Sequence, residues 1–205
     1  MRPLTDKLPK PLLRIGGKPL LQHHIEALAG AGIQELVINH AVMGEMIEAQ
    51  FGDGAEFGVN ISYSAEGDTP LETGGGIKRA LPLLGPDAFI VVNGDVLSNY
   101  DFRRLPVQPT TLAHLVLVPN PDHNPQGDFY LDNGLVSDAG EPKLTFSGIS
   151  VFKAELFKDI EEDHFPLAPL LRQAMAKGQV SGECFDGRWL DVGTPQRLEL
   201  ANNLV

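Results

Sequence analysis

The chain has 205 residues and a formal net charge of −11 at pH 7, from 16 Lys and Arg against 27 Asp and Glu. That length suits one domain with a sizeable core, and we expect residues 1–205 to form a single domain. The acidic balance argues against a surface for nucleic acid or anionic membrane, and the single cysteine, Cys184, excludes an internal disulfide. Because no membrane span or signal peptide is visible, we expect a cytoplasmic protein.

The first part of the chain predicts an extended loop followed by alternating helices and strands. Prolines exclude a regular helix or central strand near the start, and Lys10, between Pro9 and Pro11, is held more rigidly than an ordinary surface lysine. Apolar periodicity then predicts a helix over residues 20–28, a strand over 35–40, a helix over 42–51 and a strand over 59–64. This alternation predicts a three-layer, Rossmann-like α/β fold with a mostly parallel, mixed sheet.

Three consecutive glycines, Gly74, Gly75 and Gly76, stand at the start of the next predicted helix. Glycine there costs about 1 kcal/mol of helix propensity per residue relative to alanine. The gain is close approach of a ligand to the backbone, at exposed N–H groups and the positive end of the helix dipole. The pattern is neither the GxGxxG fingerprint nor a P-loop. We expect this helix start to bind the edge of a nucleobase or a phosphate.

Two carboxylates follow buried strands in the sequence. Residues 88–92 form a continuous apolar run that predicts a buried strand, and Asp95 comes just after it. Ligands in open α/β sheets bind beyond such strand ends, although an isolated Asp there more often caps a turn. Asp191 ends another apolar stretch, directly before a predicted helix. Two carboxylates delivered to one pocket suit Mg²⁺, which combines them with phosphate oxygens and water.

The second half of the chain predicts more strands and two helices. Strands are expected over residues 112–118, 129–131, 144–146, 145–152 and 180–185, and helices over 167–177 and 196–204. The short strands 129–131 and 144–146 are typical of a small inserted β-sheet. Gly148 inside a strand marks a bulge or a close approach of backbone. No ligand role is assigned to the histidines, and we expect His23 and His24 to lie on the flanks of their helix.

Several motifs together resemble the sugar-1-phosphate nucleotidylyltransferases over nearly the whole chain. They are Arg2-Pro3-Leu4-Thr5, Pro9-Lys10-Pro11-Leu12, Gly74–Gly76, Asn93-Gly94-Asp95, Phe146-Ser147-Gly148-Ile149 and Trp189-Leu190-Asp191-Val192-Gly193-Thr194-Pro195. Within the family, residues 71–77 and 144–151 are most similar to the N-acetylmuramic acid α-1-phosphate uridylyltransferases of peptidoglycan recycling. Mannose-1-phosphate guanylyltransferases are the alternative.

The resemblance implies that a nucleoside triphosphate, UTP in the preferred case, reacts with a sugar 1-phosphate and releases pyrophosphate. It implies that Asp95 and Asp191 bind Mg²⁺ and that Lys10 contacts the nucleotide phosphates, which makes Lys10 and Asp95 the catalytic residues. It further implies that the nucleotide contacts Glu72, Thr73, Gly74, Gly75 and Asn93. The sugar would contact Gly127, Asp128, Ser147 and Gly148, on the side of the inserted sheet. Catalysis in such a site rests on alignment and charge neutralisation.

The start of the chain departs from the family pattern. The family normally has a buried strand and a Gly-rich loop immediately before the Arg2-Pro3-Leu4-Thr5 element, and we therefore expect the functional protein to begin upstream of Met1. Two classes of function stay open: an active transferase, and a catalytically inactive remnant that binds nucleotide sugars. Because no exposed apolar stripe stands out, we expect a monomer or a weak homo-oligomer.

Overall fold

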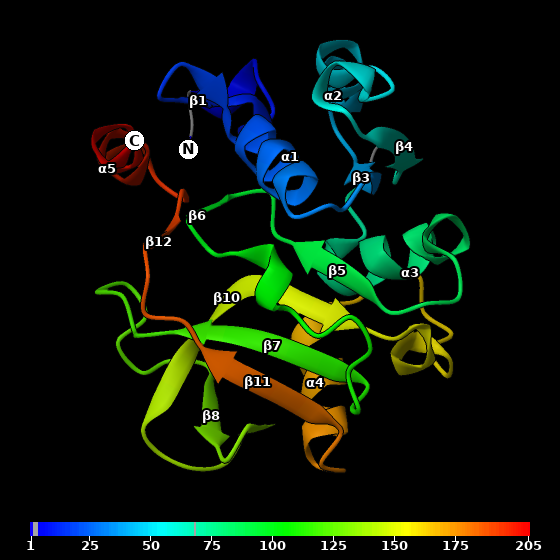
Figure 1. Cartoon of the computed structure of the whole chain (residues 1–205), viewed down its shortest axis with the longest axis vertical. Coiled ribbons are helices and arrows are strands. Elements are labelled where there is room, and N and C mark those ends of the chain that lie inside the picture. Colours follow the sequence, from blue (N-terminus) through cyan, green and yellow to red (C-terminus); the bar gives the residue numbers. More distant parts are fainter. Residues whose placement is uncertain (2–3, 68) are drawn as a thin grey trace. The chain divides into compact units, whose positions relative to one another are not determined.

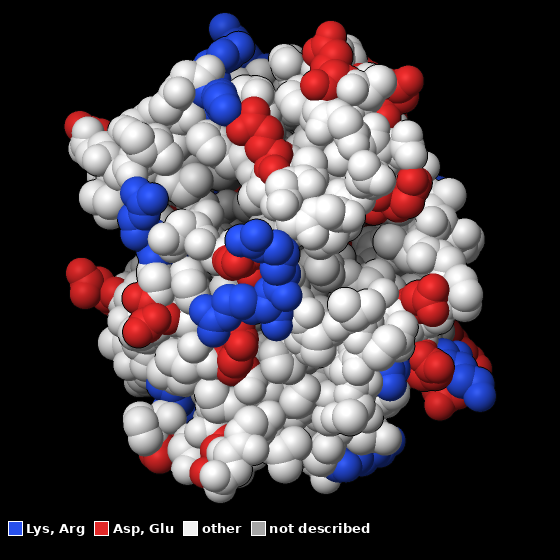
Figure 2. Space-filling model, in the orientation of Figure 1, with Lys and Arg blue, Asp and Glu red and all other residues white. Residues whose placement is uncertain are grey.

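The computed structural model describes residues 1, 4–67 and 69–205, so Arg2 and Pro3 of the first motif lie outside the described residues. The chain forms two compact units. Unit 1 comprises Met1–Pro70, Asn93–Arg103 and Arg188–Val205, and unit 2 comprises Leu71–Val92 and Arg104–Gly187. None of the described helices combines the length and the apolar character that a bilayer span requires. Figure 2 shows acidic side chains at several separate places on the visible face, in keeping with the formal charge of −11.

Unit 1 is built from short elements that come from all three of its stretches. Its helices are η1 (Leu4–Asp6), η2 (Lys10–Leu12), α1 (Leu20–Gly30), α2 (Gly44–Phe51), η3 (Ala55–Phe57) and α5 (Pro195–Leu204). Its strands are β1 (Arg14–Ile15), β2 (Lys18–Pro19), β3 (Glu35–His40), β4 (Asn60–Ala65), β6 (Val96–Ser98) and β12 (Trp189–Asp191). The short helix η4 (Phe102–Arg104) contains the passage from unit 1 to unit 2.

Two apolar clusters hold unit 1 together. β3 and β4 pair in parallel, with α2 between them in the chain, and the helices and strands bury Leu12, Ile25, Ile47, Phe51, Val59 and Ile61. The second cluster brings the end of the chain onto its beginning, because Val192 and Ala201 pack with Ile15 and Leu20, all of them fully buried. β6 and β12 pair antiparallel beside this cluster. This second cluster therefore fixes the position of the residues that follow Asp191.

Unit 2 is a six-stranded sheet with helices packed on it. The strands are β5 (Phe89–Val92), β7 (Ala113–Val118), β8 (Phe129–Asp132), β9 (Leu135–Ser137), β10 (Lys143–Phe152) and β11 (Val180–Cys184), in the order β5-β10-β7-β11-β9-β8. β7 lies between β10 and β11 (Figure 1). Its helices are α3 (Glu72–Leu84), η5 (Ala154–Phe157) and α4 (Leu167–Met175). Leu115, Leu117, Phe152 and Leu171 are at most 1% exposed at the centre of the core.

The α/β class with a mixed sheet is confirmed, but the expectation that strands pair mostly in parallel is wrong, because strand pairing depends on partners that local patterns do not reveal. The parallel pairs among the described strands are β3–β4 and β7–β11, and the other described pairs are antiparallel. The strands predicted as a small inserted sheet belong to the six-stranded sheet instead. The reason is the length of β10, which pairs with β5, β7 and also β8. β6, β9 and the β1–β2 hairpin are too short to show a period in the sequence.

Candidate active site

Lys10 forms an ion pair with Asp95 in unit 1. The Lys10 Nζ lies 2.6 Å from Oδ2 of Asp95, and the two side chains are 27% and 38% exposed. The neighbouring backbone is fixed because Pro9 is buried and Leu12 is 7% exposed. Asp95 itself ends the turn that connects β5 to β6, where the Val96 N–H donates to the Asn93 carbonyl. A cation and an anion are thus presented together, each with one side accessible to a ligand.

Asp191 is brought beside Asp95 by the pairing of β6 with β12. Asp191 stands opposite Val96 in the antiparallel register, and the Val192 N–H donates to the Asp95 carbonyl oxygen at 2.8 Å. The two carboxylate-bearing residues are therefore neighbours across one backbone ladder, although they are distant in the chain.

The guanidinium of Arg197 forms an ion pair with Asp191, and the sequence did not predict this partner. Its Nη1 lies 3.3 Å from Asp191 Oδ2, with side chains 21% and 30% exposed. Gly193 makes room for the guanidinium, because a Cβ there would lie 2.1 Å from Arg197 Nη2. The Thr194 side chain caps α5 by accepting the Arg197 N–H at 3.2 Å, and Pro195 occupies the first turn. The only signal in the sequence is the position of Arg197 in the first turn of the helix that Thr194 caps.

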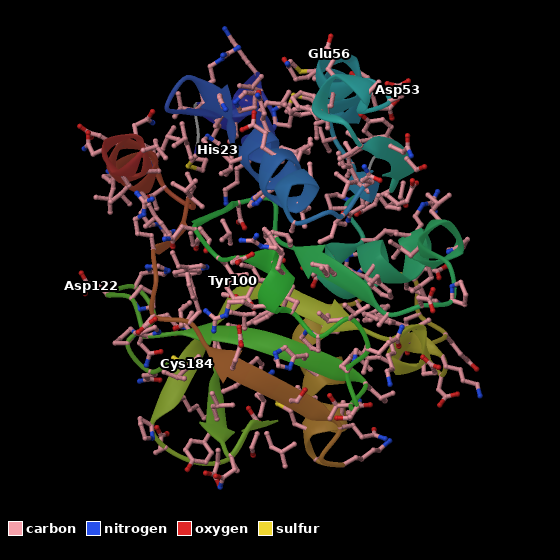
Figure 3. All side chains as sticks on the ribbon, in the orientation of Figure 1. His23, Asp53, Glu56, Tyr100, Asp122 and Cys184 are labelled. Atoms are coloured by element: carbon pink, nitrogen blue, oxygen red, sulfur yellow. The ribbon has the colours of Figure 1, made fainter. Side chains whose placement is uncertain are left out.

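His24 supports the Asp95 turn from α1. It is 7% exposed, so it does not lie on a flank of the helix as expected, and it forms a hydrogen bond with the backbone of Val96. Burial is the main reason that the pKa of His24 is lowered from 6.5 to about 4, and His23 lowers it further. The Nε2 atom of His23, which is labelled in Figure 3, lies 2.9 Å from the Ile15 carbonyl oxygen. His24 is therefore a neutral, buried support and not an acid or base at neutral pH.

The donor set of unit 1 fits a small, hard cation. Asp95 and Asp191 offer carboxylate oxygens, which Mg²⁺ prefers, and both side chains are partly exposed. Among residues 1, 4–67 and 69–205, no group of three or more His, Cys, Asp or Glu side chains could hold a metal ion. A cation held by Asp95 and Asp191 would therefore need substrate oxygens or water to complete its shell.

The glycine-rich helix start lies in unit 2, and the structure gives an intramolecular reason for two of its glycines. Gly74 and Gly75 are buried, and Cβ atoms there would lie 2.4 Å from the Phe165 ring and 2.2 Å from the Asp163 carbonyl oxygen. The Gly75 N–H donates to the Phe165 carbonyl at 3.1 Å. The close approach at these glycines is thus made by the chain itself, and the Gly75 N–H is already used.

Glu72 and Thr73 are the exposed residues of the same helix start. Glu72 has a φ of 61°, which places a residue with a Cβ in the left-handed region. Such a conformation costs free energy of order 1–3 kcal/mol and tends to occur at functional sites. Any ligand that reaches this segment from solvent meets Glu72 and Thr73 first.

Gly127 and Asp128 close a polar loop against β10. The Asp128 carboxylate accepts the Phe146 N–H at 2.8 Å and the Asn124 side-chain amide at 3.2 Å. Gly127 has a φ of 68°, and a Cβ there would lie 2.8 Å from the Lys143 carbonyl carbon. Both residues therefore hold the loop in place. A ligand at this loop would meet its backbone more than these two side chains.

Ser147 and Gly148 form an irregularity in β10. The register with β7 shifts between Phe146 and Ile149, and Gly148 adopts a φ of 79°, as its glycine identity predicts. Ser147 is 1% exposed and its Oγ accepts the Ile149 N–H at 3.1 Å. The bulge turns backbone groups of β10 out of the regular ladder.

Cys184 and His114 are two further side chains of unit 2 with shifted pKa values. Cys184, at the end of β11 (Figure 3), has a thiol pKa that is raised by partial burial and by the neighbouring Asp186 and Glu183. The pKa of His114 is lowered, mainly by burial, and its Nδ1 lies 3.0 Å from the Ser181 hydroxyl. A raised thiol pKa disfavours the thiolate that nucleophilic catalysis requires.

Comparisons with known proteins agree with the motifs. The nucleotidyl transferase family model matches residues 1–129, which is more than half of the chain. The chain belongs to the nucleotidyl transferase family. The family resemblance that the motifs carry is therefore confirmed, and the protein is an enzyme of the sugar-phosphate nucleotidyltransferase type.

Two relatives in the family are N-acetylmuramate alpha-1-phosphate uridylyltransferases. The protein from Neisseria meningitidis serogroup B is 50% identical over 214 residues, covering 100% of this chain and 93% of its own length. The protein from Caulobacter vibrioides is 34% identical over 215 residues, covering 96% of this chain and 88% of its own. A mannose-1-phosphate guanyltransferase from Schizosaccharomyces pombe is 30% identical, but the match covers 58% of its length.

Solved structures of the family share the fold. A Bacillus anthracis protein assigned as a glucose-1-phosphate thymidylyltransferase superposes with a TM-score of 0.84 at 22% identity, over 100% of this chain and 89% of its own. HddC from Yersinia pseudotuberculosis superposes with a TM-score of 0.78 at 23% identity, over 96% and 90% of the two chains. These similarities establish the α/β architecture.

Proposed function

We propose that this protein is an N-acetylmuramate α-1-phosphate uridylyltransferase, which joins UTP to its sugar 1-phosphate and releases pyrophosphate. The alignments with two relatives of that name cover nearly the full length of those proteins. The alignment with the fungal guanyltransferase covers 58% of that protein. The observation that supports a catalytic function is the Lys10–Asp95 ion pair, together with the backbone pairing that makes Asp191 a neighbour of Asp95 in unit 1. A guanylyl transfer to mannose 1-phosphate is the second candidate.

The reaction needs no protein nucleophile. An oxygen of the sugar 1-phosphate attacks the α-phosphorus of UTP, the bond from that phosphorus to the bridging oxygen breaks, and pyrophosphate leaves with its electron pair. Because both reactants are anions, alignment and charge neutralisation supply most of the catalysis. We assign Lys10 to the nucleotide phosphates, where its ammonium stabilises the charge that develops in the transition state.

We assign Asp95 and Asp191 to Mg²⁺. When bound there, the cation would neutralise phosphate charge and orient the phosphate oxygens. Asp95 is held in a turn supported by His24, and Asp191 is oriented by Arg197. The chain's own residues thus fix both carboxylates before any ligand arrives, which lowers the cost of forming the site.

We assign the remaining residues by the part of the substrate that each would meet. Glu72 and Thr73, which are exposed, would contact the nucleobase, while the buried Gly74 and Gly75 shape the turn that presents them. Asn93 lies in the turn before Asp95 and would contact the nucleotide. The sugar would meet the loop and bulge formed by Gly127, Asp128, Ser147 and Gly148.

We also propose that the enzyme acts as a monomer or a weak homo-oligomer in the cytoplasm, in peptidoglycan recycling. The single Cys184 suits a reducing compartment, and UTP is an intracellular substrate. The names of the two uridylyltransferase relatives support the place of the sugar in cell-wall metabolism.

The test is pyrophosphate release by the purified chain with Mg²⁺, UTP and N-acetylmuramate 1-phosphate, compared with GTP and mannose 1-phosphate. We expect release with the first pair and at least about a hundredfold less after Asp95→Asn. Asp159→Asn, at an exposed position, is the control and keeps full activity. Release with the second pair alone would replace the uridylyl assignment. If neither pair reacts but UTP and Mg²⁺ bind in calorimetry, the chain is a binding protein.

A further inference from the structure

Lys78 in α3 uses all its donors on one short loop. Its Nζ lies 2.9 Å from the carbonyl oxygens of Glu161 and Glu162 and 2.9 Å from Oδ1 of Asp163. An ammonium has three donors, so the group is saturated by these acceptors. The Lys78 side chain is 23% exposed, while that of Asp163 is 87% exposed. Lys78 therefore holds the loop against the helix. Residues 161–163 are all acidic, so they add no apolar side chain to this contact.

The residues that follow bracket the start of the same helix. The acidic strap, as we call residues 161–165, ends at Phe165, whose N–H donates to the Leu71 carbonyl at 3.3 Å and whose carbonyl accepts the Gly75 N–H at 3.1 Å. Leu71 and Gly75 lie on either side of Glu72 and Thr73. One residue of the strap thus fixes both ends of the segment that we assign to the nucleobase.

The strap and the helix are packed so closely that there is no space for a side chain at Gly74 or Gly75. A Cβ on Gly74 would lie 2.4 Å from the Phe165 ring, and one on Gly75 would lie 2.2 Å from the Asp163 carbonyl oxygen. The strap backbone therefore sits directly on the buried face of these glycines. Because Glu72 has a φ of 61°, its conformation needs support from its surroundings. The strap supplies that support.

The strap is unfavourable on its own. Glu161, Glu162 and Asp163 place three like charges in succession, and these repel one another. Lys78 offsets the repulsion with its charge and satisfies two backbone carbonyls. Hydrogen bonds from a charged donor are roughly twice as strong as neutral ones. Removal of the ammonium therefore frees the strap more than it disturbs the core beneath it.

We propose that Lys78 is a positioning residue for nucleotide recognition. It acts through the acidic strap, which holds Glu72 and Thr73 in the conformation that meets the nucleobase. The inference rests on the proposed function, because it depends on the assignment of that segment to the nucleotide. It predicts a selective effect: affinity for the nucleotide falls, while the chemical step and the sugar phosphate are affected little.

The experiment compares Lys78→Met with Lys177→Met, which removes the same charge from an exposed position. For Lys78→Met we expect the KM for UTP to rise about tenfold, with kcat and the KM for the sugar phosphate unchanged within about twofold. Lys177→Met leaves all three parameters unchanged. Asp163→Asn, which keeps an acceptor for Lys78, gives a smaller rise in the KM for UTP.

Hydrogen exchange supplies a second readout without substrate. We expect amides of residues 71–77 and 161–166 to exchange faster in Lys78→Met than in the parent chain, and the other amides of unit 2 to be unchanged. This measurement does not depend on activity. Equal exchange in the two proteins, or equal changes in the KM for both substrates, would overturn the positioning role.

The same exchange experiment with UTP and Mg²⁺ tests the assignment of residues 71–77 to the nucleotide separately from the positioning role of Lys78. Protection of residues 71–77 by UTP in the parent chain supports the nucleotide assignment, and its absence removes that assignment from the proposed function. If UTP protects this segment and Lys78→Met still has the parent KM for UTP, the further inference is wrong while the proposed function stands.

Discussion

The ammonium of Lys10 and the carboxylate of Asp95 are 2.6 Å apart, which makes them an ion pair that joins two distant parts of the sequence. Asp191 has a corresponding partner in Arg197, at 3.3 Å. Each carboxylate that we assign to a divalent cation therefore already has a positive neighbour from the chain itself. This pairing makes predictions about cation binding that do not depend on turnover.

Lys10→Met keeps most of the length of the side chain and removes its charge. We expect kcat to fall about a hundredfold, because one stabilising group of the transition state is lost. We also expect Mn²⁺ to bind severalfold more tightly in the absence of nucleotide, since a positive charge beside Asp95 no longer opposes it. Electron paramagnetic resonance of Mn²⁺ measures the affinity. Lys7→Met, at an exposed position, is the control. Weaker Mn²⁺ binding by Lys10→Met would show that Lys10 helps to form the cation site.

Gly193→Ala tests the orientation of Asp191. The new Cβ would meet Arg197 Nη2 at 2.1 Å, and the flexible end of that side chain moves away at little cost. We expect a change in unfolding free energy below about 1 kcal/mol but about a tenfold loss of kcat/KM. Gly30→Ala, where a Cβ meets nothing within 4 Å, is the matched control.

A double-mutant cycle decides whether Gly193 acts through Arg197. Gly193→Ala should have a much smaller effect on kcat/KM in an Arg197→Met background, because the closest group that it displaces is already gone and only the 3.0 Å contact of the new Cβ with Asp191 Oδ1 remains. Additive losses would instead show that Gly193 acts on the site by another route.

The buried His24 predicts an acid-sensitive stability. The pKa of His24 is lowered from 6.5 to about 4 in the folded protein, mainly by burial. The unfolded chain therefore binds a proton first as the pH falls below 6.5, and stability is lost progressively until the pH reaches about 4. The shift corresponds to about 3 kcal/mol at the end of that range.

Urea unfolding of the parent chain and of His24→Gln at a series of pH values checks this. Glutamine retains an N–H donor for the Val96 backbone but does not titrate. The difference in unfolding free energy between the two proteins should be constant above pH 6.5 and should shrink as the pH falls towards 4. Parallel curves across the whole range would assign the acid sensitivity to other groups.

Gly75→Ala tests the fit between the acidic strap and α3. Alanine improves helix propensity by about 1 kcal/mol, but its Cβ would lie 2.2 Å from the backbone oxygen of Asp163. A backbone atom moves less easily than the end of a side chain, so overpacking costs about 1–3 kcal/mol. This cost exceeds the gain in helix propensity. We expect a net loss of unfolding free energy in thermal unfolding, together with a higher KM for UTP. A stabilised protein would mean that the strap moves freely.

Much of the fold could be predicted from the sequence, because long periodic segments carry their own signal. The strand predicted over 35–40 coincides with β3, and the run before Asp95 is β5. The pairing of strands could not be predicted, since it depends on partners far along the chain. β6, only three residues long, shows no period, yet its pairing with β12 brings Asp191 next to Asp95.

Residue type and strand position singled out Asp95 and Asp191, and the structure makes them backbone neighbours, while their role in binding a cation stays a prediction. Arg197 and Lys78 were missed because nothing local marks them. Arg197 reaches a carboxylate in the preceding strand through the gap left by Gly193, and Lys78 binds backbone carbonyls, which have no signature in sequence. His24 was misplaced because a polar residue in a helix is ordinarily assigned to the solvent side.

The cluster of Ile15 and Leu20 with Val192 and Ala201 has a consequence for how the protein is made. A ribosome releases the chain from its N-terminus, so the first two of these side chains emerge long before the last two. Unit 2 contains no residue after Gly187 and can condense during synthesis. Unit 1 cannot complete this cluster until α5 has been translated, so Asp191 joins Asp95 only after that helix has been made. The pair of carboxylates that we assign to the cation therefore assembles later than the sheet of unit 2 can form.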